Sequence, residues 1–303
     1  MILNLFYYAC DKKEGEHRMQ NPIIMHINYC EQGQSLDRVF EVATSIGYDG
    51  VEFRRAHKGQ DLEEYLNEIY TLKDKYQLEY TLFGGPQLDT SLADPALRQE
   101  QIDQYVRFLN IANKLGLLST VNMMAGPSCD PSVPQDLYHC EAHGSSCIDQ
   151  KVWDQTVEAV RSIAAQFPQV HFAFETHMFY LHDLVQSAKA LADQIGLENV
   201  GINLDYGNAL FFPHRLPLPE TIKTAGERLF YTHFKSYQPI GEKAGQLLPT
   251  SLADGCVNHR EYVRLLKEAG FTGPIGIEAP RPGDREHFAQ EDYDYIAPLI
   301  REA

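Results

Sequence analysis

Four side chains able to bind a metal ion lie at or near the ends of short apolar segments. The segments are FAFE, INLD, YTHF and IGIE, and they supply three carboxylates and one imidazole but no thiolate. Gathered in one place, the carboxylates would repel one another, and a divalent cation would offset that repulsion. Carboxylate oxygens with one imidazole suit Mn²⁺ best, then Mg²⁺, with Co²⁺, Fe²⁺ or Zn²⁺ as further choices. The predicted metal ligands are Glu175, Asp205, His233 and Glu278.

The alternation of side chains along a strand places these groups on one face. Residues two apart point to the same side of a strand. In FAFETH that face carries Ala173, Glu175 and His177, whereas Phe172 and Phe174 lie on the other face. The same pattern recurs in the other segments, so one face suits packing against helices and the other ends in polar groups. A buried network of ion pairs without a metal is the alternative interpretation.

Amphipathic runs between these segments predict helices that alternate with strands. The run 36–46 has its apolar residues on one stripe, follows a capping Ser35 and ends before a glycine, as helices commonly do. Such alternation is typical of a parallel sheet. Eight strands in a chain of 303 residues predict an α/β fold of the (β/α)₈, or TIM, barrel type. The predicted strands are 23–28, 49–54, 78–83, 119–124, 170–175, 200–205, 229–235 and 274–278.

A barrel of this type would bring the four groups together. The C-terminal ends of all its strands meet at one mouth, where the predicted ligands would converge. The longest irregular segments, 126–149 and 236–256, both follow predicted strands and are expected over the same mouth. A doubly wound open sheet is the rival fold. The sequence does not support it with a G-x-G-x-x-G after the first strand or with a P-loop.

Composition bounds the domain organisation and the classes of partner. The hydrophobic share of 44% allows one large domain over residues 21–303, and residues 1–20 are expected to form an N-terminal extension. The formal charge of −16 provides no cationic footprint for phosphates, so nucleic acid is not an expected partner. No apolar run is long enough to span a membrane. Six widely spread cysteines are typical of reduced thiols in a cytoplasmic protein.

The segment 126–149 contains a cluster of cysteine and histidine side chains. Their spacing matches no paired C-x-x-C knuckle, so we do not expect a structural zinc site there. The two histidines are candidates for an additional base over the mouth. The residues are Cys129, His139, Cys140, His143 and Cys147.

Several pieces of the sequence together resemble one family of enzymes. They are GYDGVEF, a strand that ends in ETH, GINLDYGNAL, THFKS and LLKEAGFTGPIGIE, and they follow one another from about residue 22 to the end. In their order and placement the chain resembles the sugar phosphate isomerase/epimerase family, the xylose-isomerase-like barrels that also include endonuclease IV. The resemblance implies one divalent metal held by Glu175, Asp205, His233 and Glu278.

The resemblance also implies a class of reaction. An isomerase or epimerase of this kind would remove a proton next to the carbonyl of a ketose or keto sugar, through an enediolate stabilised by the metal. Glu175 and Glu278 are expected to take and return the proton. Many epimerases of the family carry a histidine where this chain has an asparagine, three residues after the aspartate. The residues expected to bind the sugar are Lys235, His177, Glu52, Arg54, Arg281 and Asn208.

Several of these residues have a purely structural alternative. Lys235 would otherwise act as a counter-ion to the carboxylates. Glu52 and Arg54 would form an ion pair with each other on the rim. His177 would support a metal ligand from behind, and His26, in the first strand, is expected to fill the barrel.

Other functions share this scaffold and stay open. With a leaving group β to the carbonyl, the same proton removal leads to elimination, as in a dehydratase or a 3-keto-sugar C-glycoside deglycosidase. A non-catalytic sugar-binding barrel is a second alternative. The endonuclease function is disfavoured by the acidic charge and by the lack of the further histidines that its three-metal cluster needs. The expected partner is a small-molecule sugar, and a homo-oligomer or a partner subunit stays open.

Overall fold

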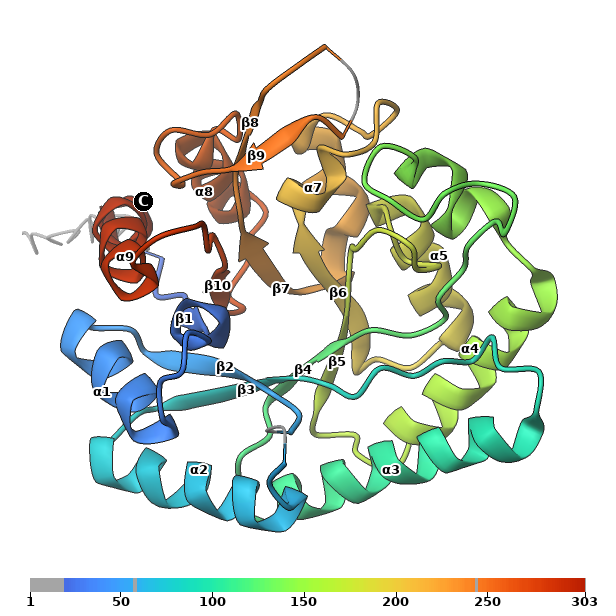
Figure 1. The fold of residues 1–303 in the computed structure, drawn as a ribbon, viewed down its shortest axis with the longest axis horizontal. Coiled ribbons are helices and arrows are strands. Elements are labelled where there is room, and N and C mark those ends of the chain that lie inside the picture. Colours follow the sequence, from blue (N-terminus) through green and yellow to red (C-terminus); the bar gives the residue numbers. More distant parts are fainter. Residues whose placement is uncertain (1–18, 57–58, 243–244, 303) are drawn as a thin grey trace, which may run out of the picture.

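Eight parallel strands form a closed barrel, which confirms the predicted fold class. The computed structural model describes residues 19–56, 59–242 and 245–302. The order around the ring is β1-β10-β7-β6-β5-β4-β3-β2, so the first strand pairs with the last, and helices surround the barrel (Figure 1). The strands are β1 (Ile23–His26), β2 (Gly50–Arg54), β3 (Tyr80–Gly84), β4 (Thr120–Met123), β5 (His171–Glu175), β6 (Val200–Asp205), β7 (Leu229–Phe234) and β10 (Ile275–Ile277).

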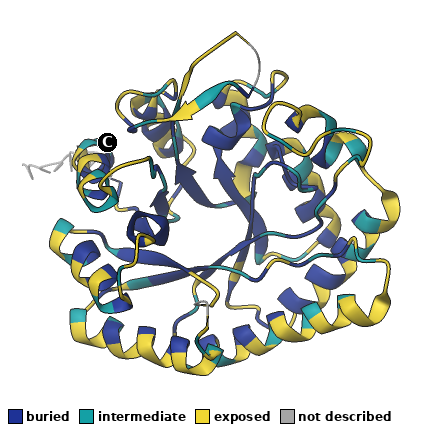
Figure 2. Cartoon of the chain, viewed as in Figure 1, coloured by how far each residue is buried: buried dark blue, intermediate teal, exposed yellow. Residues whose placement is uncertain are grey.

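Each outer helix buries one stripe against the barrel and exposes the other to solvent (Figure 2). The first helix shows the local reasons: Ser35 accepts a hydrogen bond from the backbone N–H of Arg38, and Gly47 ends the helix at a φ of 107°. Glycine adopts that conformation without the clash that a Cβ would cause. The outer helices are α1 (Leu36–Ile46), α2 (Leu62–Tyr76), α3 (Pro95–Lys114), α4 (Gln150–Ala164), α5 (Val185–Ile195), α7 (Leu218–Ala225), α8 (His259–Glu268) and α9 (Arg285–Glu302).

Four strands end earlier at the mouth than the sequence predicts, and for the predicted strands 119–124 and 229–235 the difference is a single residue. The predicted strand 23–28 stops at His26, and the chain continues as a 3₁₀ turn. The His26 ring accepts a hydrogen bond from the backbone N–H of Asn28, which turns the chain away from the sheet. The predicted strand 274–278 stops one residue early, so Glu278 lies on the segment that follows β10.

A glycine inside the barrel leaves room for the imidazole of His233 at the mouth. Ile24, Leu82 and Tyr231 belong to a compact apolar cluster in the interior. A Cβ at Gly276 would lie 2.3 Å from the hydroxyl oxygen of Tyr231 and 2.8 Å from Cδ2 of His233. Because a side chain does not approach so closely, only glycine at this position lets His233 keep its place.

Two irregular segments leave the mouth after β4 and β7, as predicted. The one after β7 contains a small antiparallel hairpin of β8 (Tyr237–Pro239) and β9 (Leu247–Pro249). In the segment after β4, His139 forms an ion pair with an aspartate of the same segment. Both ring nitrogens of His143 are hydrogen-bonded within that segment as well. These contacts do not support the predicted role of His143 as an additional base.

The described residues test only some of the predictions about the domain boundary, the cysteines and membrane-spanning helices. Of the predicted N-terminal extension, residues 1–18 lie outside the described residues, so the domain boundary stays a prediction. The five cysteines within the described ranges are free thiols. In the same ranges, none of the helices combines the length and the apolar character needed to cross a bilayer.

His259 is buried at the start of α8, and its two ring nitrogens differ in their contacts. Its Nδ1 lies 3.1 Å from the carbonyl oxygen of Leu252, and its Nε2 has no hydrogen-bond partner among the described residues. Burial lowers the pKa of His259 to about 4. An unperturbed histidine has a pKa of about 6.5. Between about pH 4 and about pH 6.5 the imidazole of His259 is therefore mostly neutral in the folded chain and mostly protonated in the unfolded chain.

Replacing His259 with glutamine is expected to reduce the acid sensitivity of the fold. Between the two pKa values the unfolded chain binds more protons, so the free energy of unfolding falls as the pH drops from about 6.5 toward about 4. From about pH 7 to about pH 5, the wild type should lose about 2 kcal/mol more than His259→Gln. Urea unfolding followed by circular dichroism at both pH values measures this difference. Equal losses in the two proteins would contradict the prediction.

Candidate metal centre

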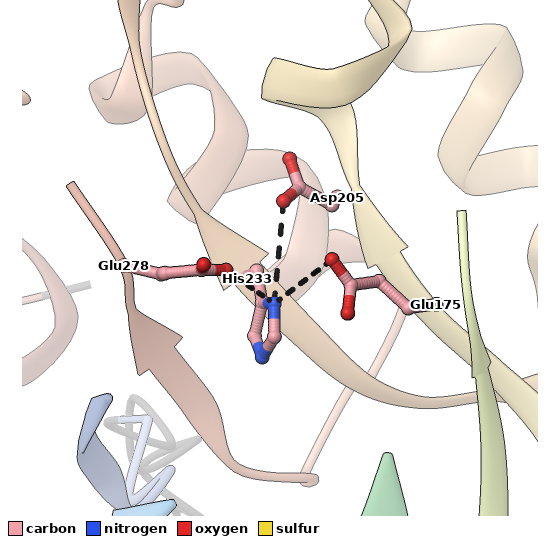
Figure 3. A group of neighbouring side chains, drawn as sticks. All are labelled: Glu175, Asp205, His233 and Glu278. Carbon is pink, nitrogen blue, oxygen red and sulfur yellow. Dashed lines mark ion pairs between the residues drawn. The ribbon is translucent and has the colours of Figure 1, made fainter. Parts of the chain in front are cut away.

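The four predicted ligands converge at the mouth of the barrel (Figure 3). Glu175 and Asp205 end β5 and β6, His233 is the penultimate residue of β7, and Glu278 directly follows β10. Each residue offers one ligand atom, and these atoms lie within 4.8 Å of one another. His233 Nδ1 lies 3.0 Å from Glu278 Oε2, 3.7 Å from Glu175 Oε1 and 4.0 Å from Asp205 Oδ2. The register explains this proximity, because Asp205 pairs directly with His233 across the sheet.

The atoms of this quartet fit a cation. Asp205 and His233 are buried, and Glu175 is only 6% exposed. Asp205 Oδ2, His233 Nδ1 and Glu278 Oε2 have no hydrogen-bond partner within the described part of the chain. Since buried polar atoms are nearly always bonded, three such atoms in one group indicate that a ligand belongs among them. Carboxylate oxygens with one imidazole nitrogen suit a divalent metal, so the quartet is a possible site for one.

Lys235 offsets part of the negative charge of the quartet. Its Nζ lies 2.9 Å from Asp205 Oδ2 and 3.1 Å from Glu278 Oε2, although neither contact has the geometry of a hydrogen bond. Burial by itself lowers the pKa of Lys235, but the two carboxylates raise it well above its ordinary value. The structure therefore places Lys235 as a counter-ion, and a contact with the sugar stays a prediction.

The members of the quartet shift one another's pKa values. Burial lowers the pKa of His233, but the neighbouring carboxylates raise it well above its ordinary value. Burial raises the pKa values of Glu175 and Glu278, but His233 for the first and Lys235 for the second are the leading causes that bring them below the ordinary value. In Asp205, burial and the repulsion of the other two carboxylates outweigh the attraction of Lys235, so its pKa is raised. Glu175 and Glu278 are therefore ionised at neutral pH.

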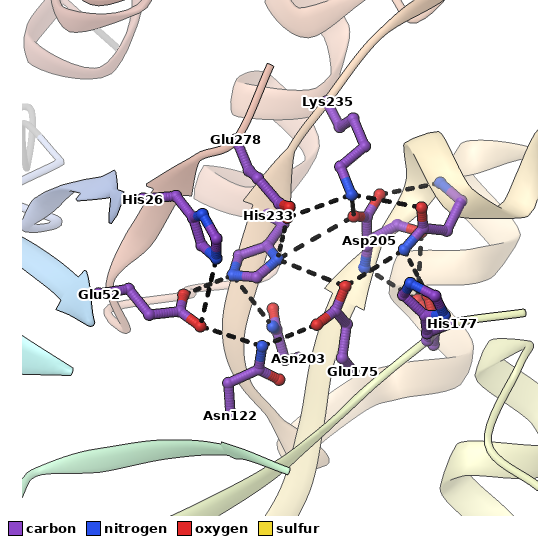
Figure 4. Close-up of polar contacts among 12 residues, drawn as sticks. His26, Glu52, Asn122, Glu175, His177, Asn203, Asp205, His233, Lys235 and Glu278 are labelled. Atoms are coloured by element: carbon purple, nitrogen blue, oxygen red, sulfur yellow. Dashed lines mark hydrogen bonds and ion pairs between the residues drawn. The ribbon is translucent and has the colours of Figure 1, made fainter. Parts of the chain in front are cut away.

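Glu52 lies beneath His233 inside the barrel, not at the rim (Figure 4). Its Oε2 accepts hydrogen bonds from His233 Nε2 at 2.7 Å and from the Tyr231 hydroxyl at 2.8 Å. Arg54, at the end of β2, forms an ion pair of 2.8 Å with Glu31. The structural alternative, an ion pair between Glu52 and Arg54 on the rim, is therefore wrong. Both side chains alternate onto the same face, but Glu52 lies two residues before the end of the strand and so one layer deeper.

Asn208 and His177 lie next to the quartet. Asn208 belongs to the short helix α6 (Tyr206–Ala209), and its side-chain amide donates to Glu175 Oε1 at 3.2 Å. Its backbone N–H donates to Asp205 Oδ1 at 2.9 Å, so Asn208 supports two of the predicted ligands. His177 is half-buried just after β5, and its Nδ1 lies 3.0 Å from a backbone carbonyl oxygen. Contact of either side chain with a sugar stays a prediction.

Arg281 is held by carboxylates of α9. Its guanidinium lies 2.8 Å from Asp292 Oδ2 and 2.5 Å from Glu291 Oε2. Asp292 also accepts hydrogen bonds from the Tyr29 hydroxyl at 2.7 Å and from the backbone N–H of Leu252 at 3.0 Å. Asp292 thereby joins the segments that follow β1, β9 and β10. An anionic group of a substrate would compete with two carboxylates for Arg281.

Two amide side chains that contact the carboxylates were not predicted from the sequence. Asn122 Nδ2 donates to Glu52 Oε1 at 3.0 Å and to Glu175 Oε2 at 2.7 Å. Asn28 Nδ2 donates to Glu278 Oε1 at 3.0 Å. The signal for Asn122 is an amide within the otherwise apolar run of β4. Asn28 gave no comparable signal. It falls in the predicted strand 23–28, whereas the observed strand β1 ends at His26.

The fold of the chain is similar to that of known proteins. Residues 40–299 match a family model described as xylose isomerase-like TIM barrel. A D-psicose 3-epimerase from Clostridium cellulolyticum H10, solved with D-tagatose, has a TM-score of 0.70 and 17% identity, and the match covers 92% of this chain and 99% of that chain. A search of curated protein sequences found no significant match.

Two further solved structures are similar to a comparable degree. A xylose isomerase-like TIM barrel protein from Mycobacterium smegmatis, solved in complex with magnesium, has a TM-score of 0.69 and 19% identity, over 93% of this chain and 97% of that chain. A probable 3-DHS dehydratase from Bacillus anthracis has a TM-score of 0.68 and 19% identity, over 91% and 98% of the two chains. At such identities the likeness to these structures shows the fold alone.

Replacing Asp205 with asparagine is expected to weaken the binding of Mn²⁺ severely. The change removes one of three negative charges from the quartet, and the loss should exceed the roughly 10–100-fold cost of removing a residue that only supports a ligand. Isothermal titration of the metal-free protein with Mn²⁺ measures the affinity. Asp193→Asn, the same change on the exposed side of α5, serves as the control and should bind as the wild type does. Unchanged affinity in Asp205→Asn would exclude the quartet as the metal site.

Proposed function

The chain belongs to the xylose isomerase-like TIM barrel family, and on this premise we propose that it is a divalent-metal-dependent isomerase or epimerase of a ketose or keto sugar. One observation carries the proposal: three carboxylates and one imidazole offer ligand atoms within 4.8 Å of one another at the ends of neighbouring strands. The similar D-psicose 3-epimerase supports the choice of a sugar as the substrate.

We infer that the metal is Mn²⁺. Three carboxylates and one imidazole form a hard donor set with no thiolate, which favours Mn²⁺ or Mg²⁺ over softer choices. When bound, the ion would act as a Lewis acid and stabilise negative charge on the carbonyl and hydroxyl oxygens of the sugar. Asn208, Asn122 and Asn28 bind the carboxylates of Glu175 and Glu278 and would keep them oriented.

The proposed proton transfer uses Glu175 and Glu278. Around the barrel, β6 and β7 separate β5 from β10, so the two carboxylates approach the centre from different sides (Figure 3). Their low pKa values keep both ionised and therefore able to accept a proton. If one removes a proton from a carbon next to the carbonyl and the other returns a proton from the opposite face, the product is an epimer. A single carboxylate that moves the proton between two carbons gives isomerisation.

Proton exchange with solvent is the most direct test of this function. The Mn²⁺-loaded protein would be incubated in D₂O with D-psicose, D-tagatose, D-fructose and a set of 3-keto glycosides, and the sugars analysed by NMR. We expect deuterium at the carbon next to the carbonyl of at least one sugar. In Glu175→Gln and Glu278→Gln the exchange rate should fall by at least about 100-fold, the scale of general acid–base catalysis.

The remaining outcomes of that experiment separate the alternatives. Release of an elimination product would favour a lyase over an isomerase. Binding of a sugar without exchange at any position would favour the non-catalytic sugar-binding barrel. Exchange that is unchanged in both glutamate variants would contradict the assignment of the two bases.

We further expect a preference for sugars without a phosphate group. Lys235, Arg54 and Arg281 each lie in an ion pair with at least one carboxylate, and the chain carries a formal charge of −16. A phosphate would therefore meet neutralised cations and a negative surrounding. With a sugar that is turned over, kcat/KM should exceed that of its phosphate ester by at least about tenfold, a difference of about 1.4 kcal/mol. A faster reaction with the ester would contradict this expectation.

A further inference from the structure

Glu52 is a fully buried carboxylate held by hydrogen bonds, with no lysine or arginine in an ion pair with it among the described residues. Oε2 accepts from His233 Nε2 at 2.7 Å and from the Tyr231 hydroxyl at 2.8 Å. Oε1 accepts from Asn122 Nδ2 at 3.0 Å. The buried His26, placed inside the barrel as predicted, has its Nε2 3.9 Å from Oε1. A buried carboxylate is costly unless such bonds compensate it, so its position in the barrel needs a reason.

The contacts of Glu52 fix the orientation of the His233 ring. Nε2 faces Glu52, which leaves Nδ1 facing the carboxylates of the quartet, 3.0 Å from Glu278 Oε2. The Tyr231 ring packs edge-on against the imidazole at a centroid distance of 4.8 Å. On another side, Gly276 lies so close that a Cβ would be 2.8 Å from Cδ2 of His233. The imidazole therefore has little freedom to turn.

Asn122 extends the same network to a second ligand. Its side-chain nitrogen donates to Glu52 Oε1 at 3.0 Å and to Glu175 Oε2 at 2.7 Å. Both N–H groups of the amide are thus used by carboxylates, one inside the barrel and one in the quartet (Figure 4). Glu52 is connected in this way to His233 directly and to Glu175 through one amide.

We propose that Glu52 is a positioning residue of the metal centre, which keeps the proton of His233 on Nε2 and presents Nδ1 to the metal. The proposal rests on the metal-dependent function proposed above, and it assigns to Glu52 a role different from the sugar contact expected from the sequence. A histidine that binds a metal through one nitrogen commonly donates its other N–H to a carboxylate, which fixes the ring and makes the ligand nitrogen more basic.

The first test compares the metal affinity of matched variants. Glu52→Gln removes the negative charge of the carboxylate. It also replaces one acceptor oxygen with an amide N–H, which would face one of the groups that now donate a hydrogen bond to Glu52. Titration calorimetry with Mn²⁺ on the folded, metal-free protein should show binding weakened by about 10–100-fold. Glu158→Gln, the same change on the exposed side of α4, should bind within about twofold of the wild type. Affinity of Glu52→Gln within about twofold of the wild type would overturn the proposal.

Tyr231→Phe provides a milder variant if Glu52→Gln fails to fold. It removes one of the two hydrogen bonds to Glu52 Oε2 and leaves the one from His233. We expect a smaller loss of Mn²⁺ affinity in the same direction, about three- to tenfold. A purely structural role of the network would lower the melting temperature of this variant without changing the metal affinity of the folded protein, and that outcome would also overturn the proposal.

The second test observes the two ring nitrogens directly. In protein labelled with ¹⁵N at histidine and loaded with diamagnetic Zn²⁺ or Mg²⁺, His233 should show a protonated Nε2 and an unprotonated Nδ1. A proton on Nδ1 with Nε2 unprotonated would overturn the proposal. If the wild type binds metal but exchanges no sugar proton, the proposed activity fails while these measurements still support the role of Glu52. If the wild type binds no divalent metal, both proposals fail together.

Discussion

Mutual repulsion among three carboxylates, two of them buried and the third half-buried, is the constraint on which the mouth of the barrel depends. Glu175, Asp205 and Glu278 approach one another in a place that water reaches poorly, where like charges interact strongly. Their neighbours respond to that repulsion: Lys235 contributes a positive charge, and the pKa of His233 is raised. Burial above all, together with the repulsion by Glu175 and Glu278, raises the pKa of Asp205 despite the attraction of Lys235.

The quartet and the barrel could be predicted from the sequence because both follow from regular geometry. Side chains alternate along a strand with a period of two, and parallel strands of a barrel all end at one mouth. Once FAFETH and GINLD are taken as strands, the side chains of Glu175 and Asp205 must point to the same side of the sheet and lie at the same end of the barrel. The direct pairing of Asp205 with His233 across the sheet adds the imidazole without any contribution from loops. Local patterns were sufficient for these features.

The sequence was less informative where a residue's depth inside the barrel, or a contact with a residue far away in the sequence, determines its position. Alternation gives the face of Glu52 but not its layer, so the same pattern fits a residue at the rim and one beneath His233. The end of β1 depends on a hydrogen bond to the His26 ring, which no propensity encodes. The ion pair between Arg281 and Asp292 could not be predicted, because Asp292 lies on α9 and nothing in the local sequence announces the contact. Contact of Arg281 with a substrate stays a prediction.

The position of Asp292 has a consequence for how the protein matures. This carboxylate joins the turn after β1, the segment that leads from Glu278 and the backbone at Leu252, and it does so from α9. The ribosome makes α9 after every other described element, and β10 closes the ring against β1 only shortly before. A nascent chain from which Glu175, Asp205 and His233 have already emerged therefore lacks Glu278, the fourth member of the quartet. The candidate metal centre can therefore be complete only after β10 and α9 have been synthesised.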